Sequence, residues 1–229
     1  MITKMIALDW LSMKYNWAGV IVIPILCIFM GMFSPTFIIP LSVFWFLGFS
    51  TTPFSAEEKG ELNYLYLTMP IRRVDVVRGR FALSILLMIV GLVIGISLLS
   101  MVSFAALNFD IPFLSSVTLS TEQYMALIAV SYFIYAFFNL FMFPFLFKLG
   151  YEKGKYLGTY LPIAVLFLAL LTHDIIMWQF EVHTSIINIL INYVAENLLL
   201  AVGGIVIIST KLLFLSYVVS VRAYNRRDF

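Results

Sequence analysis

Residues 81–107, FALSILLMIVGLVIGISLLSMVSFAAL, run without a single charged side chain. A helix needs about 20 predominantly apolar residues to cross the hydrocarbon core of a bilayer, so this run can span a membrane. The whole chain is 62% hydrophobic and 11% charged, with a mean hydropathy of +1.03. An average soluble domain is about 45–50% apolar and about 25% charged. Too few polar residues remain to cover a soluble core, and lipid is therefore the expected solvent.

The apolar runs predict an all-α, polytopic membrane protein with six transmembrane helices in a single domain over residues 1–229. The expected spans are approximately 17–33, 36–54, 81–107, 123–147, 156–172 and 195–221. Three of them contain a proline (Pro40, Pro144 and Pro162), which neighbouring helices can accommodate in a membrane. Residues 1–16 are too polar to span, and we expect an interfacial helix there, with a plain cytoplasmic tail as the alternative.

The positions of the basic residues predict the orientation. Every lysine and arginine except Lys211 falls in four segments, 1–16, 55–80, 148–155 and 222–227. The three opposite connections, near 31–35, 108–122 and 173–194, contain none. Cytoplasmic loops are the ones enriched in lysine and arginine. The chain is therefore expected in the cell membrane with both termini on the cytoplasmic side.

The charged stretch 54–81, FSAEEKGELNYLYLTMPIRRVDVVRGRF, lies between the second and third spans. Ser55 followed by Glu58 matches a capping box, and Pro70 ends the run. We expect a short amphipathic cytoplasmic helix at 56–68, with an apolar stripe formed by Leu62, Leu65, Tyr66 and Met69. Glu57, Glu58 and Glu61 would lie near its positive end. The arginines that follow are expected to reach lipid headgroups; they are Arg72, Arg73, Arg78 and Arg80.

The same stretch resembles a signature of type-2 ABC exporter permeases. The matching residues are Glu57-Glu58-Lys59-Gly60, Leu67-Thr68-Met69-Pro70-Ile71-Arg72-Arg73, Asp75-Val76-Val77 and Gly79-Arg80-Phe81. Met69 replaces a usual leucine, and Arg80 stands where lysine is common. The expected topology resembles that family over the whole chain: an interfacial N-terminal helix, six spans and both ends inside.

The resemblance implies one permease subunit of an ATP-driven exporter. Its partners would be a second permease, as a homodimer or a related heterodimer, and two separate ATP-binding subunits. ATP and Mg would be held by those subunits, since this chain has no G-x-x-x-x-G-K-[S/T] motif. The chain itself is expected to be no enzyme, to hold no cofactor or metal, and to bind no nucleic acid.

The resemblance also implies that the helix at 56–68 is a coupling helix that docks in a cleft of the ATPase. The coupling residues would be Glu57, Glu58, Gly60, Glu61, Leu62, Leu65, Tyr66, Pro70 and Arg73. Closure of the ATPases would then alternate access across the membrane. Within that family the chain resembles the permeases of the staphylococcal exporter of phenol-soluble modulins, which are amphipathic peptides. An amphipathic or hydrophobic cargo, peptide or antibiotic-like, is therefore expected.

Lys211 and a glycine pair stand out within the spans. Lys211 lies 11 residues before Arg222, about 16 Å along a helix. An ionisable side chain at that depth costs at least about 2.5–3.5 kcal/mol and usually faces a cavity or a partner. Lys211 either lines a translocation path or extends to the inner interface. Gly91 and Gly95 form a G-x-x-x-G pattern that permits close helix packing, whereas Gly150, Gly154 and Gly158 are expected to form a turn.

Two other classes remain open from the sequence. Intramembrane prenyl-type proteases also carry a Glu-Glu pair, but they need an arginine where Leu62 stands, and His173 and His183 lack an Asn or Asp four positions on. A membrane immunity or sensor protein would share the topology without needing to bind an ATPase. The outer connection with His173, Asp174, Glu181 and His183 shows no metal-ligand spacing.

Overall fold

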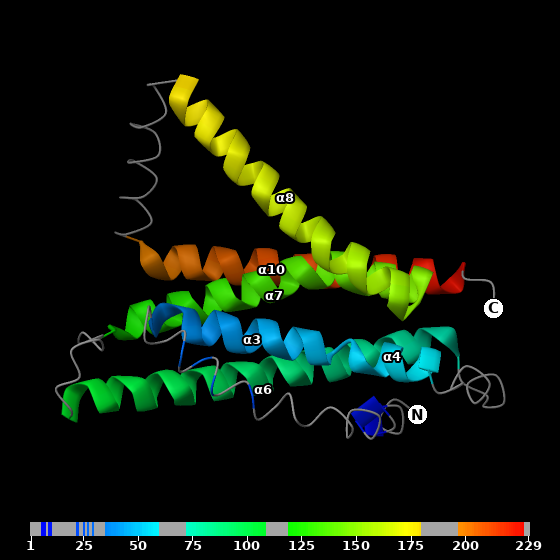
Figure 1. The fold of residues 1–229 in the computed structure, drawn as a ribbon, viewed down its shortest axis with the longest axis horizontal. Helices are drawn as coiled ribbons and strands as arrows, with labels where there is room; N and C mark the ends of the chain where they lie inside the picture. The colour runs from blue at the N-terminus through cyan, green and yellow to red at the C-terminus, as the bar shows by residue number, and fades with distance from the viewer. Residues whose placement is uncertain are drawn as a thin grey trace.

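The computed structural model describes residues 6–7, 9–10, 22, 25, 27, 29, 35–59, 72–108, 119–179 and 197–226, with only the backbone given at 35, 59, 106–107 and 169–179. All the secondary structure in these residues is helical (Figure 1). Its elements are η2 (Pro35–Phe37), α3 (Ile38–Phe49), α4 (Thr52–Lys59), α6 (Arg73–Asn108), α7 (Thr121–Leu149), α8 (Tyr151–Gln179) and α10 (Leu198–Asn225).

Within the described residues, four helical segments are long and apolar enough to cross a membrane. They are Ile38–Glu58, Arg73–Ala105, Thr121–Leu149 and Leu198–Asn225. These segments match the second, third, fourth and sixth predicted spans. The fifth predicted span lies within helix α8, which is not one of the four. Most of the first predicted span and most of the interfacial segment 1–16 lie outside the described residues.

The predicted outer connection 173–194 is wrong at its start. Helix α8 continues to Gln179, so the backbone of His173 and Asp174 is helical. Neither residue type breaks a helix, because each costs less than about 1 kcal/mol relative to alanine, against about 3 kcal/mol for proline. Polarity alone therefore did not mark the end of this helix.

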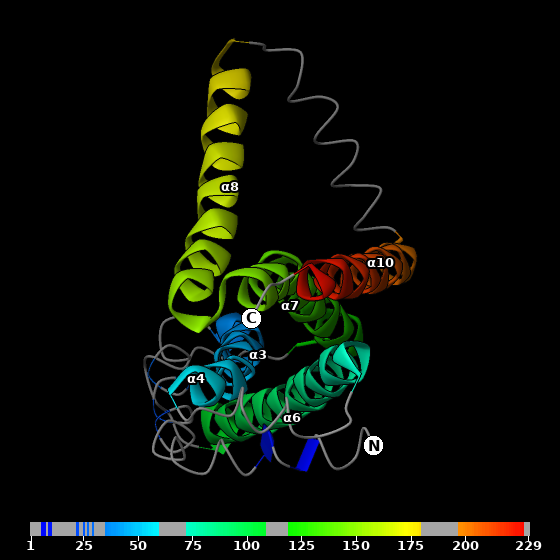
Figure 2. The same cartoon turned by 90° about the vertical axis from the view of Figure 1, so that its right-hand side faces the viewer.

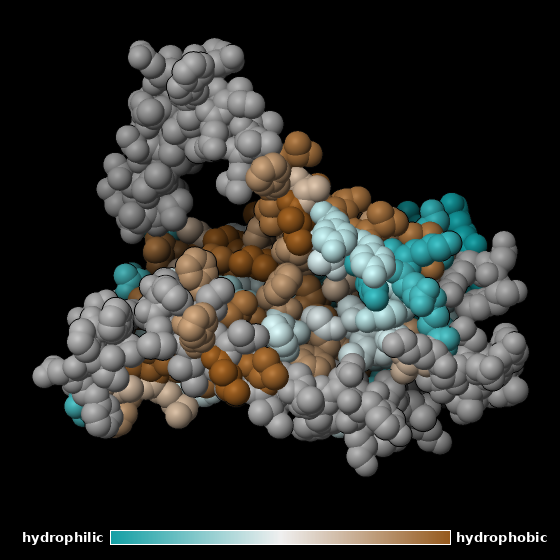
Figure 3. Space-filling model, viewed as in Figure 1, coloured by the Kyte–Doolittle hydropathy of each residue, from teal (hydrophilic) through white to brown (hydrophobic). Residues whose placement is uncertain are grey.

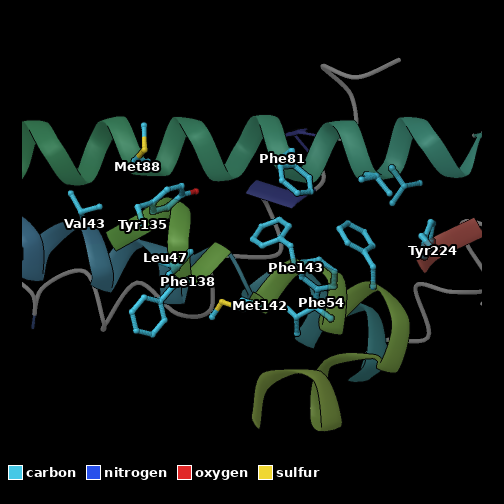
Figure 4. Packing of buried hydrophobic residues seen from close by; sticks show 14 residues of the cluster. Val43, Leu47, Phe54, Phe81, Met88, Tyr135, Phe138, Met142, Phe143 and Tyr224 are labelled. Carbon is cyan, nitrogen blue, oxygen red and sulfur yellow. The ribbon is translucent and has the colours of Figure 1, made fainter. Parts of the chain in front are cut away.

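Helix α7 is the central element of the packed part of the chain. It packs against α10, α8 and α3, while α6 packs against α3 and α10. Helices α3, α6, α7 and α10 run alongside one another in Figure 1. Aromatic residues fill the space between them (Figure 4): the Phe81 and Phe143 rings are 4.7 Å apart, and the Phe54 and Phe147 rings 4.9 Å apart.

Helix α8 leaves this group at a steep angle, as both ribbon views show (Figures 1 and 2). Its first turns press against α7 through two glycines. A Cβ added at Gly154 would lie 2.8 Å from Leu146 Cα, and one added at Gly158 would lie 2.7 Å from Met142 Cα. The prediction that these two glycines form a turn is wrong. Only Gly150, with φ 81°, is in the turn between α7 and α8.

The second predicted span is divided at Ser50 and Thr51 into α3 and α4. At this break, three successive side-chain hydroxyls donate hydrogen bonds to the backbone carbonyl three residues earlier: Ser50 to Leu47, Thr51 to Gly48 and Thr52 to Phe49. Pro53 follows at the second position of α4 and has no N–H to continue the α3 ladder. The carbonyls of Leu47 and Gly48 also accept from the backbone N–H groups of Ser50 and Thr51, so these two hydroxyls add a second donor. The Phe49 carbonyl, to which Pro53 cannot donate, accepts from the Thr52 hydroxyl.

Helix α7 begins with a capping box that the sequence analysis did not identify. Gln123 N donates to Ser120 Oγ at 3.3 Å, and Ser120 N donates to Gln123 Oε1 at 2.9 Å. The S-x-x-Q pattern at 120–123 is a known signal for a helix start. It places the start of α7 at Thr121, two residues before the predicted span.

Candidate functional site

A buried ion pair joins α4 to α6 at one end of the bundle. A terminal nitrogen of the Arg80 guanidinium donates to Glu57 Oε2, and the two residues are only 2% and 3% exposed. Both charged groups are buried away from water, so their mutual attraction offsets part of the free-energy cost of desolvating each of them. Arg80 was expected to reach lipid headgroups, and that prediction is wrong.

Two aromatic rings enclose the same guanidinium. Arg80 Cζ lies 4.1 Å from the centroid of Phe54 and 5.7 Å from that of Phe147. A planar guanidinium can stack on rings while its edge donates to a carboxylate, which an ammonium cannot do equally well. Phe54 belongs to α4 and Phe147 to α7, so one side chain of α6 contacts two other helices.

The next carboxylate, Glu58, contacts the start of helix α8. Its Oε2 accepts hydrogen bonds from the backbone N–H of Tyr151 at 2.6 Å and of Glu152 at 3.0 Å. These are among the N–H groups that a helix leaves unpaired at its first turn, where a negative charge is also favourable. Glu58 therefore caps α8 from another helix instead of its own.

Asp9, from the N-terminal segment, is buried beside this ion pair. Burial raises the pKa of its carboxyl from 3.8 to about 6; Arg80 opposes the shift and Glu57 adds to it. Two carboxylates and one guanidinium therefore interact in a place largely closed to water. Protonation of Asp9 relieves the excess negative charge.

We expect the Asp9→Asn substitution to stabilise the protein above pH 6. The folded state binds the Asp9 proton more tightly than the unfolded state, so the penalty from Asp9 appears as the pH rises from about 4 to about 6 and stays constant above. A shift of this size corresponds to at most about 3 kcal/mol. Thermal unfolding in detergent between pH 4 and 8 measures it, with Glu122→Gln as a control at an exposed carboxyl. An Asp9→Asn profile that parallels the wild type would contradict the prediction.

Basic side chains gather at the same end of the bundle. The start of α6 and the end of α10 meet there, since Arg73 Nη1 donates to the carbonyl of Asn225 at 3.2 Å. The starts of α6 and α8 and the ends of α7 and α10 supply its exposed or half-exposed cations, which are Arg72, Arg73, Arg78, Lys148, Lys153, Lys155, Arg222 and Arg226. Figure 3 shows hydrophilic residues over this end and apolar ones over the middle.

A second polar group lies deeper, between α6, α7 and α10. Asn139 Nδ2 donates to Ser84 Oγ at 3.2 Å, and Ser216 Oγ donates to the Asn139 backbone carbonyl at 2.9 Å. Ser84 also bonds the Tyr135 hydroxyl. All four residues are 1% exposed or less. Interhelical hydrogen bonds of this kind hold membrane helices in a defined register.

The predicted coupling residues divide into three groups. Glu57 and Glu58 lie in α4, where they contact α6 and α8; Arg73 is the exposed first residue of α6. The others lie outside the described residues: Gly60, Glu61, Leu62, Leu65, Tyr66 and Pro70. The predicted helix start and capping box are wrong, because α4 begins at Thr52 and Ser55 is already inside it.

Lys211 is exposed near the middle of α10, 13 residues after Leu198 and 14 before Asn225. The side chains one turn away on either side are exposed and apolar: Ile207, Ile208, Phe214 and Leu215. The adjacent Thr210 hydroxyl lies 3.2 Å from the Tyr132 hydroxyl of α7. A cation thus lies on an exposed and otherwise apolar face near the middle of this candidate span.

Gly91 and Gly95 both face α3. A Cβ at Gly91 would lie 3.2 Å from Val43 Cα, and one at Gly95 would lie 3.0 Å from Ile39 Cα. The close approach lets Ser42 Oγ donate to the Gly91 carbonyl at 2.9 Å. These glycines therefore pack two helices of this chain together.

The family model of an ABC-2 family transporter protein matches residues 4–225. The chain belongs to the ABC-2 transporter family. No curated protein and no solved structure matches it. As an ABC-2 permease it is a multi-pass membrane subunit of an ABC transporter, and ATP hydrolysis lies in a separate subunit family. Permeases of this family normally work with an ATP-binding subunit and a second permease.

Three residues of these buried polar groups were not predicted from the sequence. Neither Asp9 nor Asn139 was singled out. Arg80 was assigned to headgroups because it precedes an apolar run. An arginine next to phenylalanine, 23 residues after a glutamate in a chain with few charges, was the available signal for a buried pair.

Proposed function

We propose that this ABC-2 permease exports an amphipathic or hydrophobic substrate by alternating access, driven by ATP-binding subunits that dock at the segment containing α4. The membrane-subunit role follows from the family; the direction, the substrate class and the docking segment are the proposal. Its cargo would be a peptide or antibiotic-like molecule. Both termini and the basic end of the bundle would face the cytoplasm, where ATP is available.

One observation carries the proposal: α4 is joined by polar and aromatic contacts to the membrane helices. The Glu57–Arg80 pair links it to α6, and Phe54 links it to Phe147 of α7. A force applied to α4 from outside the membrane would therefore act on two spans at once. Docking at this segment is useful to an ATP-driven permease only if such a connection exists.

Glu57 and Glu58 would serve this docking indirectly. Glu57 is buried and Glu58 is bonded to α8, so neither carboxylate is directed at a soluble partner in this structure. Direct contact with the ATPase would fall to the apolar stripe that follows, at Leu62, Leu65 and Tyr66. Lys211 would line the translocation path, where water or an anionic group of the cargo stabilises its charge.

Purification from native membranes tests the docking. A tagged wild-type permease is expected to bring down an ATP-binding subunit in mild detergent. The Leu62→Glu/Leu65→Glu variant is expected to lose at least about nine-tenths of it, because two charges in an apolar contact cost several kcal/mol. Leu149→Glu, a similar change at an exposed position at the end of α7, is the control and should retain it.

The outcome also decides between the remaining classes. Absence of an ATP-binding subunit from the wild-type preparation would contradict the proposal and favour an immunity or sensor role without transport. Retention of the subunit by the Leu62→Glu/Leu65→Glu variant would place the docking surface elsewhere. The protease alternative has no support, because the matched family is a transport family.

A further inference from the structure

We propose that Glu58 is a positioning residue that sets the tilt of helix α8 and transmits movement of α4 to it. The inference rests on the proposed function in one respect: the movement of α4 would come from a docked ATPase. The dependence of α8 on Glu58 is a property of the permease alone.

The contacts of α8 single out this carboxylate. Among the described elements, α8 packs mainly against α7 and also contacts α4. The α4 contact includes the two hydrogen bonds from the N–H groups of Tyr151 and Glu152 to Glu58 Oε2, at 2.6 and 3.0 Å. A charged acceptor at the first turn of a helix makes hydrogen bonds about twice as strong as neutral ones. Glu58 therefore anchors the first turn of α8 to α4, in addition to the packing of α8 against α7.

The junction before α8 permits rotation. Gly150 has φ 81°, a conformation that favours glycine, and it separates the last residue of α7 from the first of α8. Gly154 and Gly158 bring the next two turns against the backbone of α7, so α8 has a contact about which it can pivot. A displacement of Glu58 acts at one side of that contact.

The far part of α8 lacks packing that would fix its tilt within the described chain. Ile163, Val165, Leu166, Phe167 and Leu168 are all exposed. Leu168 lies 10 residues after Gly158, about 15 Å along the helix from the contact with α7. A change of tilt of about 15° about that contact would move it by about 4 Å. A small shift at the carboxylate thus becomes a measurable displacement in the membrane.

The first experiment uses the permease alone in nanodiscs. Spin labels are attached at Met125→Cys in α7 and Leu168→Cys in α8, both exposed positions, in a Cys27→Ser background. Pulsed EPR measures the distance between them in wild type, Glu58→Ala, Glu58→Gln and the matched control Glu152→Ala. Glu58→Ala removes the acceptor, Glu58→Gln keeps an oxygen at the same place, and Glu152→Ala removes an exposed neighbouring acid.

The expected result is a shift or broadening of about 4 Å or more in Glu58→Ala, recovery of most of the wild-type distribution in Glu58→Gln, and no change in Glu152→Ala. If loss of charge or of overall stability caused the effect, Glu58→Gln would not recover the wild-type distance distribution. Coinciding distributions for Glu58→Ala and wild type would overturn the proposal.

The second experiment adds the copurified ATP-binding subunit and ATP with vanadate. The wild-type distance is expected to change on ATP binding, and the change is expected to disappear in Glu58→Ala while the ATPase remains bound. A full ATP-dependent change in Glu58→Ala would overturn transmission through Glu58. A complex in which ATP moves neither α8 nor any other span would instead contradict the proposed function, whatever the first experiment showed.

Discussion

Glu57→Ala is expected to destabilise the permease by about 3–5 kcal/mol, the usual cost of removing one partner from a buried ion pair. Arg80 would then remain buried between Phe54 and Phe147 with one anion fewer beside it. The expected consequence is a large fall in the thermal midpoint in detergent, together with a low yield of monodisperse protein. Glu152→Ala, which truncates an exposed acid, should change the midpoint little.

The double variant Glu57→Leu/Arg80→Met separates the pair from its surroundings. Replacing a buried ion pair by apolar side chains of similar volume is often neutral or stabilising. The double variant should therefore be more stable than Glu57→Ala, even though it removes more polar groups. A double variant that is less stable than Glu57→Ala would show that the ion pair is not the reason why substitutions at this end of the bundle destabilise the permease. Coupling to the ATPase should still be impaired in the double variant, since the fixed connection between α4 and α6 is gone.

Asn139→Leu is expected to cost about 1–3 kcal/mol. Ser84 Oγ loses the hydrogen bond from Nδ2, and Ser216 Oγ loses the one to Oδ1. Ser84 keeps its bond to Tyr135 and Ser216 keeps its bond to the backbone carbonyl of residue 139, so the loss is that of two hydrogen bonds, each worth about 0.5–1.5 kcal/mol. The substitution keeps a similar side-chain volume, so little of the effect would come from a cavity. Thermal unfolding measures it, with Asn108→Leu at an exposed asparagine of α6 as the matched control.

A fourfold variant, Ser84→Ala/Tyr135→Phe/Asn139→Leu/Ser216→Ala, tests the cause, because it also removes the Tyr135 hydroxyl that Ser84 bonds. Removing both partners of a hydrogen bond is far less costly than removing one. The fourfold variant should therefore regain a large part of the stability lost by Asn139→Leu. Further loss in the fourfold variant would mean that these hydroxyls do not depend on the amide.

The sequence was sufficient for the elements whose signal is local. Uncharged runs such as 81–107 give long helices because the hydrocarbon core requires them. Helices α6, α7 and α10 match the prediction to within a few residues at their shared boundaries, except that α6 begins eight residues earlier, at Arg73. The basic residues were also placed together on one side, where the described helix ends meet. Neither inference needs tertiary contacts.

The candidate site was less accessible because its residues act across the fold. Glu57 and Glu58 lie on neighbouring positions of α4, yet one pairs with a residue 23 positions later and the other with backbone groups 93 and 94 positions later. A capping pattern from Ser55 to Glu58 was a reasonable local interpretation of the same glutamate. The actual partner of Glu58 is the first turn of α8, which lies far away in the sequence, so the local sequence around Glu58 gives no sign of it.

The arrangement of the glycines illustrates the same limit. Gly91 and Gly95 lie within one uncharged run, so a packing role could be inferred from their spacing. Gly154 and Gly158 have that spacing too, but three charged residues nearby suggested a loop: Glu152, Lys153 and Lys155. Helix α8 begins in the polar region, and its charges lie on the exposed or half-exposed side while the glycines face α7. Charge marks contact with water here, not the absence of a helix.

The central claim is that ATP alternates access to the middle of this permease. It is tested most directly at Lys211, replaced by cysteine in the Cys27→Ser background and exposed to a membrane-impermeant thiol reagent from either side of sealed vesicles containing the copurified ATPase. The account predicts that the cysteine reacts from the cytoplasmic side without nucleotide, and from the outer side after ATP and vanadate are added. Reactivity that does not change sides in a complex that hydrolyses ATP would contradict it.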